Sequence, residues 1–465
     1  MSDTRFRSDL LASKPVLSAV RWSAFPYVFQ VATLALFGWL IVNGWGVGLG
    51  REAAFLKVLR KTNATTLLTW GIWWPLMVFG AIAFGRAWCA VCPMELVDNI
   101  FGRIARGVGI GGWGIPRWLS AGFGILVLFV VLQFLVGGLA LHRNPAYTSW
   151  MLLTLVAIAA ISGVVFTQRR SFCKAFCPAN LLLSVHGRMT PLQIAAADTG
   201  TCESCKTKDC IRKDRSGRWN GASCPSGVPV YSRRDGDACV LCFQCAKACP
   251  HDNVGFGLQA SAPRRRSPLS VAEALFVVVA SGFVMHELFT EIKPLEGIFH
   301  YPAEQLHAIL GEPIAWSWMH ASWYLVGFPA ALWGIVLGVL RAAGRRGIAE
   351  TLAASALVLA PVIAACHLSK ALAKLNSWGP YLTTSLADPQ GVPAAETFFS
   401  KASSAAPAGA LPFTVIAAAA IALCLSGGVY AWSRRAPTGS MLPRLIVPLV
   451  GVMYLTVLVL WLVAH

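Results

Sequence analysis

Hydrophobic residues occur along this chain in long runs, and a single long polar stretch interrupts them at about residues 168–270. Each run is long enough to cross a hydrocarbon core, which needs about 20 residues as a helix. There are nine such runs, near residues 24–45, 65–85, 118–140, 149–167, 271–290, 316–340, 350–369, 411–432 and 444–464. The pattern predicts a mainly α-helical, polytopic membrane protein with four helices, a polar insert and then five helices.

The same pattern divides the chain into three segments. We expect an N-terminal four-helix membrane domain over residues 1–167 and a polar segment over residues 168–268. Residues 269–465 form the predicted C-terminal five-helix membrane domain.

Composition agrees with a membrane protein and excludes a soluble or disordered one. Hydrophobic residues make up 56% of the chain and charged residues only 13%, about half the usual share in globular proteins. Of the 39 Lys and Arg residues, 30 fall before the first run, in the polar insert and in other segments on the same side. This asymmetry predicts a cytoplasmic N-terminus, a cytoplasmic insert and a C-terminus on the opposite side. The basic excess therefore reflects orientation and gives no reason to expect a nucleic-acid partner.

The insert contains four closely spaced cysteines followed by a proline: Cys239, Cys242, Cys245 and Cys249 before Pro250. This is the spacing of the bacterial ferredoxin run that binds a cubane iron–sulfur cluster. A zinc site fits less well, because zinc usually takes pairs of cysteines separated by a longer loop.

A second, looser cysteine run lies upstream, and in two-cluster ferredoxins the last cysteine of each run ligates the other cluster. We therefore expect two [4Fe–4S] clusters and a small α+β ferredoxin module. The predicted ligand sets are Cys202, Cys205, Cys210 and Cys249 for one cluster, and Cys224, Cys239, Cys242 and Cys245 for the other. For the upstream run, a structural zinc site is the alternative.

Two further cysteine pairs stand where predicted membrane helices end on the cytoplasmic side. They are Cys89 with Cys92, and Cys173 with Cys177, and each pair is followed by proline and preceded by arginine. The sequence leaves open whether these four thiols are inert, form a redox-active dithiol, or bind a metal or a third cluster. The two remaining cysteines, Cys366 and Cys424, lie in apolar runs and are expected to be inert.

Histidines gather near the outer ends of the C-terminal helices. His286, His320 and His367 lie within apolar runs, and His300 and His307 lie in the predicted loop between two of them. Ionisable residues at membrane depth are costly and often functional. His286, His320 and His367 are therefore candidates for a quinol site or for ligands of haem b, with an interfacial structural role as the alternative.

Over about residues 20–260, these cysteine motifs together resemble the membrane-bound polyferredoxins of the NapH/NosR type. The resemblance implies a multi-pass protein of the bacterial inner membrane, with a periplasmic C-terminus. It also implies electron transfer from quinol, or from a membrane or periplasmic redox partner, in support of a respiratory enzyme. It assigns cluster roles to the eight insert cysteines and a redox or metal role to Cys89, Cys92, Cys173 and Cys177.

The related CcoG-type proteins resemble copper reductases that act in oxidase assembly, which gives a second hypothesis of a metal reductase or assembly factor. Whether the chain is itself a component of a quinol-linked oxidoreductase stays open at this stage. Cys89 and Cys92 are separated by two residues, where the NapH/NosR-type family commonly has three. Residues 270–465 lie outside the resemblance.

Overall fold

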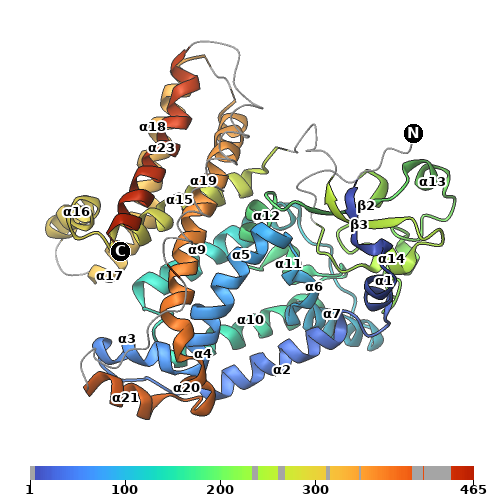
Figure 1. Ribbon diagram of the computed structural model, residues 1–465, viewed down its shortest axis with the longest axis horizontal. Helices are drawn as coiled ribbons and strands as arrows, with labels where there is room; N and C mark the ends of the chain where they lie inside the picture. Colours follow the sequence, from blue (N-terminus) through green and yellow to red (C-terminus); the bar gives the residue numbers. More distant parts are fainter. Residues whose placement is uncertain are drawn as a thin grey trace. The chain divides into compact units, whose positions relative to one another are not determined.

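The computed structural model describes residues 6–232, 239–259, 268–310, 315–344, 347–400, 412 and 441–464. These residues are mostly helical, which confirms the predicted mainly α-helical class (Figure 1). The chain forms two compact units: unit 1 comprises Met1–Gly38, Gly80–Ser120 and Thr154–Ser267, and unit 2 comprises Trp39–Phe79, Ala121–Leu153 and Pro268–His465.

Seven helical segments among the described residues are long and apolar enough to cross a membrane. They are Tyr27–Gly44, Ala64–Phe84, Pro145–Val165, Val271–Phe289, Trp316–Ala342, Ile348–Ala387 and Leu445–Val463, and each matches a predicted run. The predicted run at 118–140 forms a shorter apolar helix, α9 (Phe123–Gly138). Apart from residue 412, the predicted run at 411–432 lies outside the described residues.

Two of these segments contain a short π-helical stretch. Leu67–Trp73 separates α4 (Ala64–Thr66) from α5 (Trp74–Phe84), and Trp323–Gly327 separates α17 (Trp316–Ser322) from α18 (Phe328–Ala342). Both stretches end just before a proline, Pro75 or Pro329. Proline lacks the N–H that would continue the regular bonding pattern, so the turn before it widens.

Unit 1 combines short helices with a small sheet. Its helices, three of which continue into unit 2 (α2, α5 and α10), are α1 (Lys14–Arg21), α2 (Tyr27–Gly44), α5, α6 (Trp88–Val91), α7 (Pro93–Gly107), α8 (Arg117–Ser120), α10 (Pro145–Val165), α11 (Ser171–Ala175), α12 (Asn180–Gly187), α13 (Thr199–Ser204) and α14 (Gln244–Ala248). The strands are β1 (Phe6–Asp9), β2 (Leu192–Ala196) and β3 (Val254–Gln259), antiparallel in the order β1-β3-β2. The strand pair β2–β3 therefore brackets the cysteine runs, which lie between them in the sequence.

The N-terminal segment is part of this sheet, which the hydropathy pattern did not predict. Gly257 pairs with Asp9 of β1, and a side chain at Gly257 would overlap the carbonyl oxygen of Ser8. Asp9 also accepts hydrogen bonds from the backbone N–H groups of Leu11, at 2.9 Å, and Phe256, at 3.0 Å. Leu11 packs in the core beside residues of β2 and β3, so the segment before the first membrane helix is anchored on the module.

Unit 2 is a helix bundle. Its helices are α3 (Ala53–Thr62), α4, α9, α15 (Val271–Phe289), α16 (Lys293–Leu310), α17, α18, α19 (Ile348–Trp378), α20 (Leu382–Ala387), α21 (Val392–Ser400) and α23 (Met441–Val463). Phe129 of α9 packs against Phe276 and Phe283 of α15, with ring centroids 5.0 and 6.0 Å apart.

The segment predicted as a loop after the fifth run is helical as α16. It was missed because its apolar positions, such as the buried Phe299 and Ala303, alternate with polar residues instead of forming a spanning run.

Candidate redox and metal sites

Four cysteines from the two insert runs line one partly enclosed cavity. The cavity lining includes Cys202, Cys205 and Cys210 from the upstream run and Cys249 from the downstream run. Cys202 lies on α13, whose first turn is capped by Asp198, which accepts hydrogen bonds from the N–H groups of Gly200 and Thr201. The structure thus brings together the set that crossed ligation requires.

Asn253 follows Cys249 at the end of the downstream run and donates hydrogen bonds to two of these sulfurs. Its Nδ2 lies 3.3 Å from Sγ of Cys202, and its backbone nitrogen lies 3.4 Å from Sγ of Cys249. Hydrogen bonds to cluster sulfurs are a known means of raising a cluster's potential. Hydrogen bonding from Thr207 lowers the pKa of Cys205 to about 7, whereas burial raises the pKa of Cys210 to about 11.

In the second set, Cys239 and Cys242 lie in a tight loop that leads into α14, Cys245 lies on α14, and Cys224 lies in an earlier segment. Leu241 and Phe243, on either side of Cys242, have positive φ angles of 49° and 54°. Such conformations are costly for bulky residues and are concentrated at functional sites. Gln244 accepts a hydrogen bond from the N–H of Ala222 at 3.1 Å, which holds the segment carrying Cys224 against α14.

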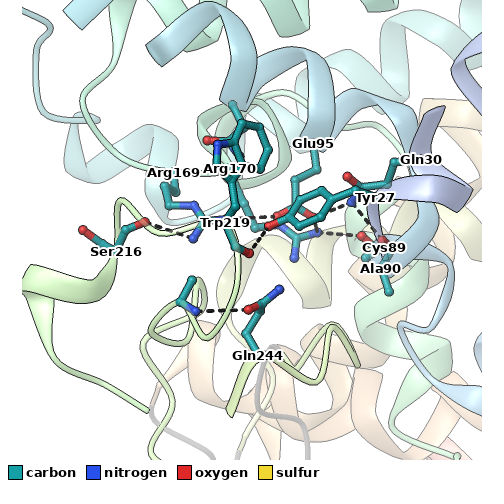
Figure 2. Close-up of polar contacts among 12 residues, drawn as sticks. Tyr27, Gln30, Cys89, Ala90, Glu95, Arg169, Arg170, Ser216, Trp219 and Gln244 are labelled. Carbon is teal, nitrogen blue, oxygen red and sulfur yellow. Dashed lines mark hydrogen bonds and ion pairs between the residues drawn. The ribbon is translucent and has the colours of Figure 1, made fainter. Parts of the chain in front are cut away.

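The long spacing between Cys210 and Cys224 contains a loop that is held by residues of the membrane-exit helices (Figure 2). Tyr27 donates a hydrogen bond to the carbonyl of Trp219 at 2.6 Å, and Arg169 donates one to Ser216 at 3.0 Å. The guanidinium of Arg103 lies 4.0 Å from the ring centroid of Trp219, in cation–π geometry. The extra residues in this run therefore attach the loop to α2, to α7 and to the segment that follows α10.

Cys89 with Cys92 and Cys173 with Cys177 are called the membrane-exit pairs. The arginine that precedes each pair contacts the segment that carries the other pair. Arg86, which precedes the first pair, donates to the side chain of Asn180, and Asn180 donates to the carbonyl of Cys173 in the second pair. Arg170, which precedes the second pair, donates to the carbonyl of Cys89 in the first pair at 3.0 Å. The repeated arginine in the sequence thus corresponds to a reciprocal contact between the two motifs.

The four thiols of these pairs are partly buried and close enough to interact electrostatically. Cys92, Cys173 and Cys177 contact one apolar cluster that includes Met94 and Phe172. Burial raises the pKa of Cys177 to about 12 and raises those of Cys92 and Cys173, and the charge of neighbouring thiols, including Cys89, adds to each shift. Thiols that bind a metal must lose their protons, and the metal supplies the compensating charge. The donor set of four partly buried cysteines suits such a centre.

A buried ion pair, Arg170 with Glu95, lies next to Cys89 (Figure 2). The side chain of Arg170 is only 3% exposed and lies 3.5 Å from Oε2 of Glu95. Gln30 donates to the same Glu95 oxygen at 3.3 Å and to the carbonyl of Ala90 at 2.8 Å. Although burial lowers the pKa of Arg170, the charges of Glu95 and of three thiols raise it overall; those thiols are Cys173, Cys89 and Cys242.

Burial raises the pKa of the Cys242 thiol to about 12; Glu95 adds to this shift and Arg170 opposes it. Burial lowers the pKa of Lys174, and the charges of Cys173 and Cys224 oppose this shift. Arg170 and Lys174 are thus each within electrostatic reach of a membrane-exit thiol and of a thiol of the second insert set. Sequence reasoning missed the roles of Glu95 and Arg170, and the signal that could have revealed them was an acid two residues after the first Cys-Pro step.

The structure groups the histidines differently from the predicted set. His286 and His320 lie together, and the third member of the group is His300 of α16. His367 lies elsewhere in unit 2, with ring centroids 6.2 Å from Trp74 and 5.2 Å from Phe283. Among the other two cysteines, Cys366 is buried in α19, and Cys424 lies outside the described residues.

Comparison with known proteins gives distant similarity only. No family model matches the sequence, and no solved structure matches it. Two uncharacterized proteins of Methanocaldococcus jannaschii are similar. One, MJ0749, is 25% identical over 134 residues, or 25% of this chain and 49% of the relative. The other, MJ0750, is 21% identical over 170 residues, or 37% of this chain and 45% of the relative.

YccM of Escherichia coli K12, named as a candidate electron transport protein, is 22% identical over 205 residues. This covers 39% of the present chain and 54% of YccM. The chain spans about half the length of the curated relatives it matches.

Proposed function

We propose that this protein is a membrane-bound iron–sulfur electron carrier with two [4Fe–4S] clusters in its insert and a third metal centre at the membrane-exit cysteines. Electrons pass between the quinol pool, or a redox partner in the membrane or periplasm, and the insert clusters. The proposal places the insert on the cytoplasmic side of a bacterial inner membrane and links the protein to a respiratory or periplasmic enzyme, as in the NapH/NosR type.

The observation that carries this proposal is the shared cavity of Cys202, Cys205, Cys210 and Cys249. Three of these residues come from one run, and the fourth follows the other run at the Cys-Pro step. This combination is what crossed ligation in a two-cluster ferredoxin requires. A pair of independent zinc loops gives no reason for Cys249 to join the upstream run. The distant similarity to YccM, which is named for electron transport, supports the same class of function.

The membrane-exit cysteines support a relay because they and Cys242 of the second insert set interact with the same arginine, Arg170. The charge of Arg170 reaches Cys89 and Cys173 on one side and Cys242 on the other. A third [4Fe–4S] cluster on Cys89, Cys92, Cys173 and Cys177 would supply positive charge that compensates the negative charge of the four partly buried thiolates. The chain's own residues bind the centres, exclude water from them and set their potentials, and the clusters, when bound, carry the electrons.

A reduction assay tests this order. Full-length protein, purified anaerobically in detergent, is mixed with a reduced quinol analogue, and cluster reduction is followed by EPR. We expect Cys89→Ser/Cys92→Ser to stop quinol-driven reduction while the insert clusters stay reducible by dithionite. Cys366→Ser is the matched control, because Cys366 is buried but belongs to none of the three sets.

A different outcome would favour the copper hypothesis. If the double variant keeps quinol-driven cluster reduction but loses copper binding, the four thiols handle metal and do not relay electrons. The relay proposal is then wrong for these residues.

A further inference from the structure

Three histidines of unit 2 converge from three different helices. They are His286 near the end of α15, His300 in the middle of α16 and His320 on α17. We propose that these three imidazoles bind one transition-metal ion of the zinc and copper class. The proposal uses none of the cysteines and is independent of the proposed function.

The geometry is that of a compact nitrogen ligand set. One ring nitrogen from each histidine lies within 4.8 Å of the other two. Among the residues that the structure describes, this is the only group of three or more potential metal ligands that is so close. A nitrogen ligand lies about 2.0–2.1 Å from zinc, so nitrogens on one tetrahedral ion are about 3.4 Å apart. Nε2 of His320 already lies 2.8 Å from a ring nitrogen of His300, and a bound ion would take the place of this direct contact.

The ring environment favours ligation. Nδ1 of His286 is buried and makes no hydrogen bond. Buried polar atoms are normally paired, so such a nitrogen calls for a ligand. Tyr324 stacks on His286 with a centroid distance of 4.1 Å and an interplanar angle of 4°, and Trp316 stacks on His320 at 5.5 Å and 23°. These aromatic rings fix the two imidazoles and exclude water from one side of the group.

The chemistry of the set selects the ion. Imidazole is a preferred ligand of zinc and copper, whereas magnesium and calcium take oxygen ligands. Three protein ligands leave one tetrahedral position open, as in zinc sites that bind water or substrate. His300 and His320 cannot hold a porphyrin between them, because their ring centroids are only 3.8 Å apart.

Metal binding to the intact protein tests the proposal. Cluster-loaded, full-length protein is treated with a mild chelator, supplied with Zn²⁺ or Cu⁺ alone, desalted and analysed for metal. We expect about one extra ion per chain, and its X-ray absorption spectrum should show nitrogen neighbours at about 2.0–2.1 Å. Competition between the two ions then identifies the preferred metal.

Variants locate the ion. We expect His300→Gln and His320→Gln each to weaken binding at least tenfold while iron content stays unchanged. His307→Gln, on the same helix as His300 but outside the group, should bind as the unchanged protein does. Equal metal binding by all three variants overturns the proposal. So do sulfur neighbours at about 2.3 Å, a measurement that needs no variant to fold.

Discussion

The guanidinium of Arg170 contacts the two cysteine motifs and a buried acid at the same time. It donates to the carbonyl of Cys89, pairs with Glu95, and lies within the field of Cys242. A positive charge held in a site of low polarity interacts strongly with any change of charge nearby. We therefore infer that Arg170 is a positioning residue and that its charge would raise the potentials of the proposed centres near it.

Replacing Arg170 with Gln should lower the reduction potential of the centre at the membrane-exit cysteines. The expected shift is on the order of 60 mV, equivalent to about 1.4 kcal/mol for one electron. EPR-monitored redox titration measures it. In the double variant Arg170→Gln/Glu95→Gln the buried acid is also neutralised, so the shift should be smaller. Arg169→Gln is the control, because Arg169 lies farther from Glu95, at 4.0 Å, and an equal shift in that variant would contradict the assignment.

Asn253 provides a second test at single-residue scale. Replacing Asn253 with Asp removes the N–H that donates to Sγ of Cys202 and places an acceptor there. The cluster on the Cys202 set should become harder to reduce, whereas the potential of the other insert cluster should change little. Redox titration resolves the two signals, and equal shifts in both would argue against the ligand sets given above.

Individual secondary-structure elements differ in how far the sequence could predict them. Long apolar runs have few alternatives to membrane-spanning helices, so six of the seven segments were predicted within a few residues of the observed bounds. The seventh, Ile348–Ala387, continues 18 residues past the predicted run at 350–369. Strand β1 has only four residues and α16 alternates apolar and polar positions, so neither produces a run. Their structure depends on what they pack against, which hydropathy does not encode.

Strand β1 gives an element-scale prediction. Gly257→Ala adds a Cβ that overlaps the carbonyl of Ser8, so β1 must move away from β3. We expect a loss of stability of about 1–3 kcal/mol, typical of overpacking, seen as a lower temperature of cluster loss. Gly217→Ala is the matched control, because a Cβ at Gly217 meets no atom within 4 Å. Equal stability of the two variants would show that the pairing of β1 with β3 contributes little to the stability of the protein.

At the scale of the whole molecule, the sequence predicted two ligand sets in the insert because spacing within a cysteine run is a local property, and it left the chemistry of the four membrane-exit cysteines open. It did not predict how the sets lie relative to one another, since that depends on contacts such as Arg86 with Asn180 across 94 residues. For the same reason it selected His367 as the third histidine, whereas the structure places His300 beside His286 and His320. Depth in an apolar run can be read from sequence, but the neighbour across a helix interface cannot.

Orientation is a whole-molecule prediction that reporter fusions check. The excess of Lys and Arg, 30 of 39 on one side, predicts that the insert and the N-terminus face the cytoplasm. Alkaline phosphatase fused after Asn144 should be active, and the same reporter fused after Gly217 should be inactive. A fluorescent protein that folds only in the cytoplasm should give the opposite pattern, and the reverse result for both reporters would invert the topology.

The central claim is that this chain binds iron–sulfur clusters on three sets of four cysteines, and iron and acid-labile sulfide analysis tests it most directly. Protein purified without oxygen should contain about 12 iron and 12 sulfide per chain, from three clusters of four. Cys242→Ser should weaken one insert cluster, Cys89→Ser/Cys92→Ser should remove about four iron atoms, and Cys366→Ser should remove none. Zinc in place of iron, or iron that is unchanged in the set variants, would contradict the account.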